Sequence, residues 1–473
     1  MAAVAVMAAV CNCQQLPPAE SPLPPDEPQA SETDAPEVNT PEVDDQDTYI
    51  PGQEVEIVLD ANQAYINRRT VSAVTGEPLG VYPAWIPTSP GADFSGWYYD
   101  PECTSPFDVE NDIIKGSMIL YAGYVRRIKL VDKGKVARVT GNSLSGETLP
   151  NPNYTCSKYN LGGTDLGIIW EMSDGTYGIA FGDSYGSDFK PVGGGPGGAS
   201  DWRSNVLAYS QSTDFTRGLV FSGMMMDTSR PYRAAPIIVR ENYRAFTYIP
   251  TGAICLDGVE FVHYMYWEVM DRSHAYENYS SYCMSLDAGK TWINCRSRIK
   301  FPSESYFCMV GMARPEGSPY CYLLGTQSGN GYRLSAARLA RVKPSDILDR
   351  DKYEYWNGTR RRWLKGSESL ATDLLEARIG ELSFMYNEKY GRWIVMYIDN
   401  TLGICYRTAP SVIGPWSDEK VLCPSSDSRY KGVYGSFMHP ACMKADWDGD
   451  LYWTMSQWGP YNVFLMRASI SYE

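Results

Sequence analysis

The chain has 473 residues and a formal net charge of −14, and 44% of its residues are hydrophobic. This length exceeds what one compact core usually serves, so we expect more than one folded unit. No run rich in Lys or Arg offsets the negative charge, which would repel a phosphate backbone, so nucleic acid is excluded as an expected partner.

An apolar run opens the chain. Residues 1–10, MAAVAVMAAV, are too few to span a bilayer and are followed at once by Cys11 and Cys13. The pattern is typical of the end of an export signal, and its last residues before Cys11 loosely resemble a lipoprotein cleavage box. We expect residues 1–13 to be a signal remnant, Cys11 to carry a lipid, and the protein to reach the outer-membrane surface or the periplasm. An unprocessed, disordered start is the alternative.

Two further segments precede the main body of the chain. Residues 14–52 are rich in Pro, Glu, Asp, Ser and Thr and poor in large apolar side chains, which predicts a disordered acidic tether. Residues 53–125 alternate apolar positions with Pro and Gly turns, which predicts a small all-β domain. Its stretches FSGWYYDPECTSPFD and MILYAGYV resemble the bacterial surface repeat of the Listeria–Bacteroides type, and this resemblance implies a spacer or adhesion module.

Residues 126–473 consist of short apolar runs separated by turn residues, with few amphipathic runs of helical length. The stretch SLDAGKTW, Ser285 to Trp292, fits the Asp-box pattern, in which Asp and Ser/Thr side chains bond the turn backbone of a propeller hairpin. Asp287 is therefore expected to be structural. The length suits five four-stranded blades, with six as the alternative. The predicted fold is all-β: a five-bladed β-propeller preceded by the small β domain.

The stretch GGTDLGIIWEMSDGTYGIAFGDSYG, residues 162–186, predicts a hairpin with an aspartate at the outer end of each strand. Asp174-Gly175 between two apolar runs is a strong turn signal. A three-residue loop centred on Asp174 would pair Asp165 with Asp183, whereas a two-residue loop would shift the pairing by one.

Two opposed carboxylates repel each other unless one of them holds a proton or a ligand. Glycoside hydrolysis needs such a pair, because one protonated carboxyl donates to the leaving oxygen while an ionised one acts as base or nucleophile. Asp165 and Asp183 are therefore the predicted catalytic residues. In the alternative interpretation Asp165 caps a turn beside Gly162-Gly163, and Asp183 opens the glycine-rich loop that follows.

That loop, PVGGGPGGASDWRSN (191–205), matches no phosphate-binding pattern, because no strand–glycine–helix context follows. It is expected to form the rim of the site. Trp202 and Arg203 would stack on and bond a sugar ring, or Arg203 would form a surface pair with Asp201.

A series of motifs across residues 135–473 resembles domain-of-unknown-function family 4185, now grouped as glycoside hydrolase family 183, the endo-D-arabinanases. The motifs are NLGGTDLGIIW, FGDSYG, DWRSNVLAYS, IPTGAICLDG, LLGTQSG, GELSFMYN, GPWSD, YGSFMHP and WGPYNVFLMR, together with the Asp box. The resemblance implies a five-bladed β-propeller that cuts internal linkages in the D-arabinofuranose chains of mycobacterial arabinogalactan and lipoarabinomannan. It also implies Asp165 in GGTDLG and Asp183 in FGDSYG as the two catalytic acids.

Other candidates are expected around this pair. Glu381 in GELSF would bring a third carboxylate, tuning a neighbour's pKa or binding a hydroxyl, or would be structural. His439 in FMHP would donate to substrate or be a core histidine. The segments shared with the family also offer subsite lining by Arg203, Asn205, Trp458, Tyr461 and Asn462. No His/Asp/Glu cluster has metal-ligand spacing, and we expect no cofactor; a calcium ion in an axial channel is the alternative.

The sequence thus predicts an exported, monomeric endo-acting glycosidase whose partner is a D-arabinan polysaccharide. Two alternatives stay open. One is a non-catalytic carbohydrate-binding or adhesion propeller, because the fold alone does not fix a function. The other keeps the glycosidase chemistry and changes the substrate to L-arabinan or another furanoside.

Overall fold

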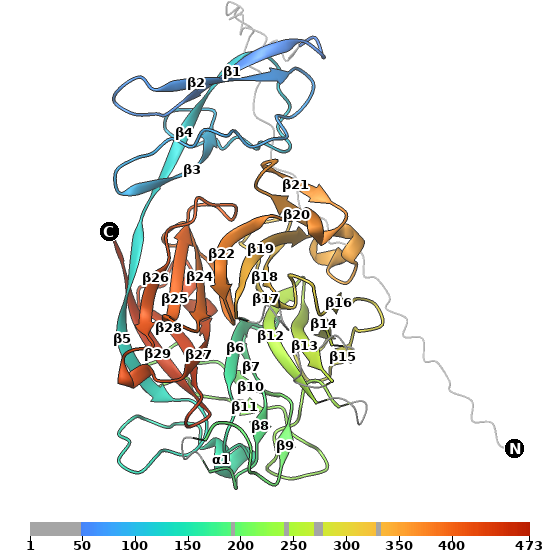
Figure 1. Cartoon of the computed structure of the whole chain (residues 1–473), viewed down its shortest axis with the longest axis vertical. Coiled ribbons are helices and arrows are strands. Elements are labelled where there is room, and N and C mark those ends of the chain that lie inside the picture. The colour runs from blue at the N-terminus through green and yellow to red at the C-terminus, as the bar shows by residue number, and fades with distance from the viewer. Residues whose placement is uncertain (1–48, 191–193, 241–245, 269–277, 328–332) are drawn as a thin grey trace, which may run out of the picture. The chain divides into compact units, whose positions relative to one another are not determined.

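The structure, a computed structural model, describes residues 49–473 apart from 191–193, 241–245, 269–277 and 328–332 (Figure 1). The predicted signal remnant (1–13) with Cys11 and nearly all of the predicted tether (14–52) lie outside the described residues. Strands dominate, and the predicted all-β class is confirmed. None of the helices in the described part of the chain combines the length and the apolar character needed to cross a membrane.

The first four strands form one sheet. β1 pairs antiparallel with β2 and parallel with β4, and β3 pairs antiparallel with β4. Their bounds are β1 (Glu54–Asp60), β2 (Arg68–Val74), β3 (Ala92–Tyr98) and β4 (Met118–Arg126). Leu59, Trp97 and Leu120 are buried in the core of this sheet. The strands lie in the segment for which the sequence predicts a small β domain, with Arg126 one residue past it.

Five further sheets follow, each named here by its first strand. The β6 sheet contains β6 (Leu166–Glu171), β7 (Tyr177–Phe181), β10 (Val206–Ser210) and β11 (Gly223–Met224). Between β7 and β10 the chain forms a separate ribbon of β8 (Ser184–Tyr185) and β9 (Trp202–Arg203). The β12 sheet contains β12 (Thr247–Leu256), β13 (Val259–Trp267), β14 (Tyr279–Ser285), β15 (Ile293–Asn294) and β16 (Phe301–Pro302).

The last three sheets complete the series. The β17 sheet contains β17 (Met309–Ala313), β18 (Cys321–Thr326), β19 (Ser335–Val342), β20 (Glu354–Asn357), β21 (Arg362–Lys365) and β22 (Asp373–Ile379). The β23 sheet contains β23 (Leu382–Asn387), β24 (Arg392–Asp399), β25 (Gly403–Ala409) and β26 (Lys420–Pro424). The β27 sheet contains β27 (Val433–Met438), β28 (Leu451–Gln457), β29 (Asn462–Tyr472) and, from the other end of the chain, β5 (Ile128–Arg138).

Among the described residues, helical segments are short and lie in the connections. They are α1 (Thr155–Tyr159) and the 3₁₀ turns η2 (Pro344–Asp346), η3 (Arg350–Lys352), η4 (Glu368–Leu370), η5 (Ser428–Tyr430) and η6 (Pro440–Met443).

The five first strands contact one another in turn. β6 contacts β12, β12 contacts β17, β17 contacts β23, β23 contacts β27, and β27 contacts β6. In Figure 1 these sheets run from green through yellow and orange to red, and cyan β5 lies along red β29, with which it pairs. Residues at the starts of these strands are therefore brought together from five distant parts of the sequence.

The sheets are covered on both faces, and this explains why many of their strands are apolar at successive positions. Every residue of β24, RWIVMYID, is buried, and neighbouring residues of β7, Ile179 and Ala180, belong to different core clusters. A strand covered on both faces reads as a continuous apolar run rather than an alternating one.

The Asp box is structural, as the sequence predicts. Asp287 accepts hydrogen bonds from the Thr291 N–H (2.8 Å) and hydroxyl (2.7 Å), and these bonds lower the pKa of Asp287 to about 2. The box joins β14 to β15.

Candidate active site

The hairpin that carries the two aspartates has the predicted three-residue loop. The Met172 N–H donates to the Thr176 carbonyl across 2.8 Å, and Asp174 accepts from the Thr176 N–H. Pairing of Ile168 with Ala180 and of Trp170 with Gly178 follows from this loop. The register is therefore confirmed from the turn as far as Ile168.

A bulge at Gly167 then shifts the pairing by one residue, so the prediction that Asp165 pairs with Asp183 is wrong. Leu166 pairs with Phe181, and the Gly182 N–H donates to the Asp165 carbonyl across 3.1 Å. Gly167, at φ 96°, supplies the extra residue. A Cβ on Gly182 would lie 2.3 Å from Asp165 Oδ1, so the glycine leaves room for the carboxyl group.

Strand β28 holds this bulge in place. Ser456 Oγ accepts from the Leu166 N–H across 2.8 Å, and Thr454 Oγ donates to the Gly167 carbonyl across 2.6 Å. The position of Asp165 is thus set by residues nearly 300 positions later in the chain.

Asp165 is partly exposed as a residue, but its carboxyl oxygens differ. Oδ2 accepts hydrogen bonds from the hydroxyls of Tyr434 (3.0 Å) and Tyr461 (2.9 Å), whereas Oδ1 is buried with no hydrogen-bond partner. Burial and the charge of Asp183, with a smaller contribution from Glu381, raise the pKa of Asp165 from 3.8 to about 7. The two tyrosine hydrogen bonds favour the ionised form and limit this rise.

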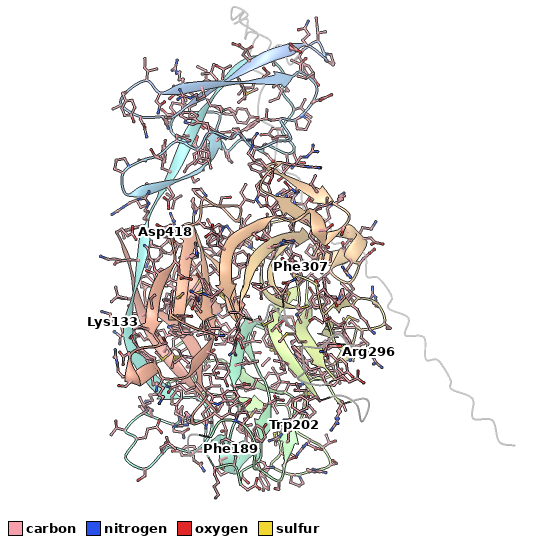
Figure 2. The ribbon with its side chains drawn as sticks, viewed as in Figure 1. Lys133, Phe189, Trp202, Arg296, Phe307 and Asp418 are labelled. Carbon is pink, nitrogen blue, oxygen red and sulfur yellow. The ribbon has the colours of Figure 1, made fainter. Side chains whose placement is uncertain are left out.

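Asp183 follows β7 and is held from the next sheet. Its Oδ1 accepts from the Thr247 hydroxyl across 2.6 Å, and the side chain of Trp202 (labelled in Figure 2) also hydrogen-bonds it. Burial raises the pKa of Asp183 to about 6, against these two hydrogen bonds. As the pH rises Asp183 loses its proton first, and its negative charge then helps to keep the proton on Asp165.

A third carboxylate lies near the pair. Glu381 is buried at the start of β23, where Arg333 Nε donates to its Oε2 across 2.8 Å and Arg333 Nη2 donates to its Oε1. A guanidinium held in this two-point geometry keeps the carboxylate ionised. The charge of Glu381 contributes to the raised pKa of Asp165.

Aromatic rings surround the carboxyl pair. Tyr461 contacts Tyr185 edge-on at 5.6 Å between ring centroids, and Trp458 contacts Tyr461 and Tyr434 at 6.0 and 6.2 Å. Trp458 remains 51% exposed. A Cβ on Gly195, which has φ 75°, would lie 2.5 Å from the Trp458 indole, so the glycine-rich segment can pass close to this ring.

Four of the predicted substrate-binding residues therefore lie around the aspartates: Trp202, Glu381, Trp458 and Tyr461. The other four, Arg203, Asn205, His439 and Asn462, are buried inside the fold. Asn205 is fully buried, where its Oδ1 accepts from the N–H groups of Ile237 and Ile238. Arg203 is also buried and donates to the carbonyls of Asn160 and Ala234.

Asn462 is buried in the same way, and His439 is the core histidine that the sequence offers as its alternative. Asn462 is fully buried and donates to the Pro460 carbonyl across 2.8 Å. His439 caps η6 by accepting from the Ala441 N–H, and it packs between Tyr177 and Phe215 with no exposed surface. These polar side chains satisfy backbone groups inside the fold, which sequence alone does not separate from subsite lining.

Three residues that complete the site were not predicted: Tyr434, Thr247 and Arg333. Tyr434 stands in the YGSFMHP motif, so the motif did carry a signal. Thr247 and Arg333 stand in stretches with no recognisable pattern. In the described ranges, no three His, Cys, Asp or Glu side chains gather in a way that could hold a metal ion.

Fold and site together define an all-β protein of successive four- to six-stranded sheets with a coupled pair of partly exposed aspartates. The chain belongs to the family described as Domain of unknown function (DUF4185), whose model matches residues 150–467. This confirms the family that the motif series predicts. The narrower likeness to glycoside hydrolase family 183 and the N-terminal surface repeat stay predictions.

Similar proteins are distant. "Notoamide biosynthesis cluster protein J'" of Aspergillus versicolor is 23% identical over 300 residues, which cover 60% of this chain and 78% of that protein. A putative hydrolase from Bacteroides ovatus aligns at a TM-score of 0.46 and 15% identity, over 66% of this chain and 86% of its own. A family-43 endo-arabinanase from Bacillus licheniformis aligns at a TM-score of 0.35 and 12% identity. The alignment covers 66% of this chain and 96% of that chain. Both TM-scores lie below 0.5, so we base no functional conclusion on these structures.

Proposed function

We propose that this protein is a glycoside hydrolase in which Asp165 and Asp183 act as an acid–base pair. One observation carries the proposal: Asp165 and Asp183 flank the two strands of one hairpin, Asp165 Oδ1 is buried without a hydrogen-bond partner, and burial with the charge of Asp183 raises the pKa of Asp165 to about 7 while burial raises that of Asp183 to about 6. Paired titratable groups whose pKa values are separated by their surroundings are typical of acid and base roles in this chemistry.

We further propose that the five sheets are the blades of a closed five-bladed β-propeller. The contacts that run from β6 through β12, β17, β23 and β27 back to β6 support closure. The pairing of β5 with β29 supports it too, because it completes the last sheet with a strand from the start of the domain. In such a fold the starts of the first strands surround one mouth, where Asp165, Thr247, Glu381 and Tyr434 would meet the substrate.

The roles follow from the hydrogen bonds. Asp165 Oδ2 is occupied by two tyrosine hydroxyls, so its proton would sit on the unpartnered Oδ1 and pass to the leaving glycosidic oxygen. The bond from the sugar's anomeric carbon to that oxygen breaks, and its electron pair stays with the oxygen. Asp183, ionised and held by Thr247, either takes a proton from the attacking water or attacks the carbon itself. Both routes require Asp183 to be ionised.

The proposed substrate is D-arabinan, the D-arabinofuranose polymer of mycobacterial arabinogalactan and lipoarabinomannan, cut at internal linkages. Support comes from the motif series that resembles the endo-D-arabinanases. We also propose export and a lipid anchor at Cys11, supported by the apolar run of residues 1–10.

Digestion of purified mycobacterial arabinogalactan, with the products sized by chromatography, tests this function. We expect oligosaccharides of mixed length early in the reaction, because an endo-acting enzyme cuts inside the chain. Binding without release of sugar would contradict hydrolysis and favour the carbohydrate-binding alternative. Parallel digestions of L-arabinan and other furanosides identify the substrate, and preferential cleavage of one of them would contradict the D-arabinan assignment.

A further inference from the structure

A cavity of about 240 Å³ is lined in part by Tyr434, the residue that hydrogen-bonds Asp165. Its wall comes from the β27 sheet and from the turns of the β23 sheet, and its lining includes Arg333, Asp399, Asn400, Tyr434 and Trp458. This volume is below the roughly 300–1,000 Å³ of pockets that take drug-sized ligands, so it suits a small unit such as one sugar ring.

Tyr434 connects this cavity to Asp165. The Tyr434 hydroxyl donates to Asp165 Oδ2 across 3.0 Å, while its ring lines the cavity. A group bound in the cavity would therefore be a near neighbour of a group at the carboxyls. Trp458 offers an exposed aromatic face at the same wall, and aromatic faces favour the apolar side of a sugar ring.

The charges that line the cavity are already paired. Arg333 is held by Glu381 through two hydrogen bonds and lies 5.3 Å above the Tyr434 ring. Asp399, whose side chain is 2% exposed, faces Arg378 at 3.3 Å and accepts from the N–H groups of Thr401 and Leu402. Each charge that lines the cavity is balanced by a partner. The cavity therefore offers polar groups but no unbalanced charge to attract an ionic ligand.

We propose that this cavity is a subsite for one neutral sugar unit of the glycan, adjacent to the bond that is cut, with the ring packed against Trp458. The inference rests on the proposed function for the neighbouring unit, and it adds the place in the fold where one further sugar unit of the neutral glycan is held. A uronate would bring a negative charge next to Asp399, while the lining Arg333 is already paired with Glu381, which is unfavourable.

Isothermal titration calorimetry tests the subsite on protein carrying Asp165→Asn, so that ligand is not consumed. The probe is a linear arabinofuranosyl hexasaccharide. Adding Trp458→Ala is expected to weaken binding about tenfold, as for loss of a central aromatic contact. Adding Asn400→Trp should weaken it at least as much, because the bulky ring fills the cavity without touching the carboxyl pair. Tyr65→Ala, which removes another exposed aromatic ring, is the matched control and should leave the affinity unchanged.

Unchanged binding in both Trp458→Ala and Asn400→Trp would overturn the subsite, as would absence of binding to the parent protein. An oligogalacturonide of the same length should bind more weakly; equal or tighter binding would overturn the neutral class. These outcomes are separable from the proposed function. If the wild-type protein hydrolyses the glycan and neither variant weakens binding, only the subsite proposal is wrong. If binding depends on Trp458 but no hydrolysis occurs, only the proposed hydrolase function is wrong.

Discussion

Tyr434, on the first strand of the β27 sheet, donates a 3.0 Å hydrogen bond to Asp165, which precedes the first strand of the β6 sheet. Tyr461 donates to the same oxygen across 2.9 Å. Burial raises the pKa of both tyrosine hydroxyls well above its usual value, so they remain donors. One carboxyl oxygen is thereby fixed, and the other is left for a proton.

A plot of kcat/KM against pH should be bell-shaped and narrow. Asp183 must be ionised, so activity rises as the pH passes its pKa of about 6; Asp165 must be protonated, so activity falls as the pH passes its pKa of about 7. Measurement of kcat/KM from pH 4 to 9 checks this. An activity that stays at its maximum to pH 9 would contradict the role of Asp165 as the acid.

Tyr434→Phe should move the alkaline side of this bell to higher pH. The variant removes a hydrogen bond that favours ionised Asp165, so the pKa of Asp165 rises, by about one unit if the lost bond is worth about 1.5 kcal/mol. Tyr430→Phe is the control, because Tyr430 donates to a different carboxylate, Asp132. The same pH profile compares them. A shift to lower pH in Tyr434→Phe would be incompatible with the assignment.

Glu381→Gln should shift the alkaline side in the opposite direction. The negative charge of Glu381 contributes to the raised pKa of Asp165, so its removal lowers that pKa and the acid loses its proton at lower pH. Glu354→Gln, which changes a carboxylate paired with Arg341, is the matched control and should not move the profile. Failure of Glu381→Gln to move it would mean that Glu381 is only structural.

Asp165→Asn should stabilise the protein in a pH-dependent way. Because burial raises the pKa of folded Asp165 above its ordinary 3.8, the stability it contributes is fully present below pH 3.8 and is lost as the pH rises to about 7. An uncharged Asn avoids that loss, which is at most about 4 kcal/mol. Urea unfolding should therefore show a gain over wild type at pH 8 that is absent at pH 3.5. An equal difference at both values would show that the charge of Asp165 is not the cause.

Sequence reasoning located the aspartates because their hairpin is local. The Asp174-Gly175 turn and the apolar runs on either side fix the register from Met172 to Ile168. The bulge at Gly167 could not be predicted from the sequence, because Thr454 and Ser456, which hold it, lie in a distant strand. A one-residue shift of this kind has no local sequence signature other than the glycine itself.

The surroundings of the pair were harder to predict for the same reason. Thr247 and Tyr434 lie in two different sheets and Arg333 lies just before β19, and they reach Asp183, Asp165 and Glu381 only in the folded chain. Asn205 shows the opposite case, and His439 takes the core alternative. They stand in motifs typical of the family but bond backbone groups inside the core, and a motif does not distinguish a residue needed for folding from one needed for binding.

The direct test of the central claim is the rate of arabinan hydrolysis by Asp165→Asn and Asp183→Asn, each compared with Asp174→Asn. Asp174 lies in the exposed turn of the same hairpin, so its variant controls for changing an aspartate there. Both site variants should lose about 10² to 10⁴ in kcat, and Asp174→Asn should keep wild-type activity. Near wild-type turnover in both site variants would contradict catalysis by this pair.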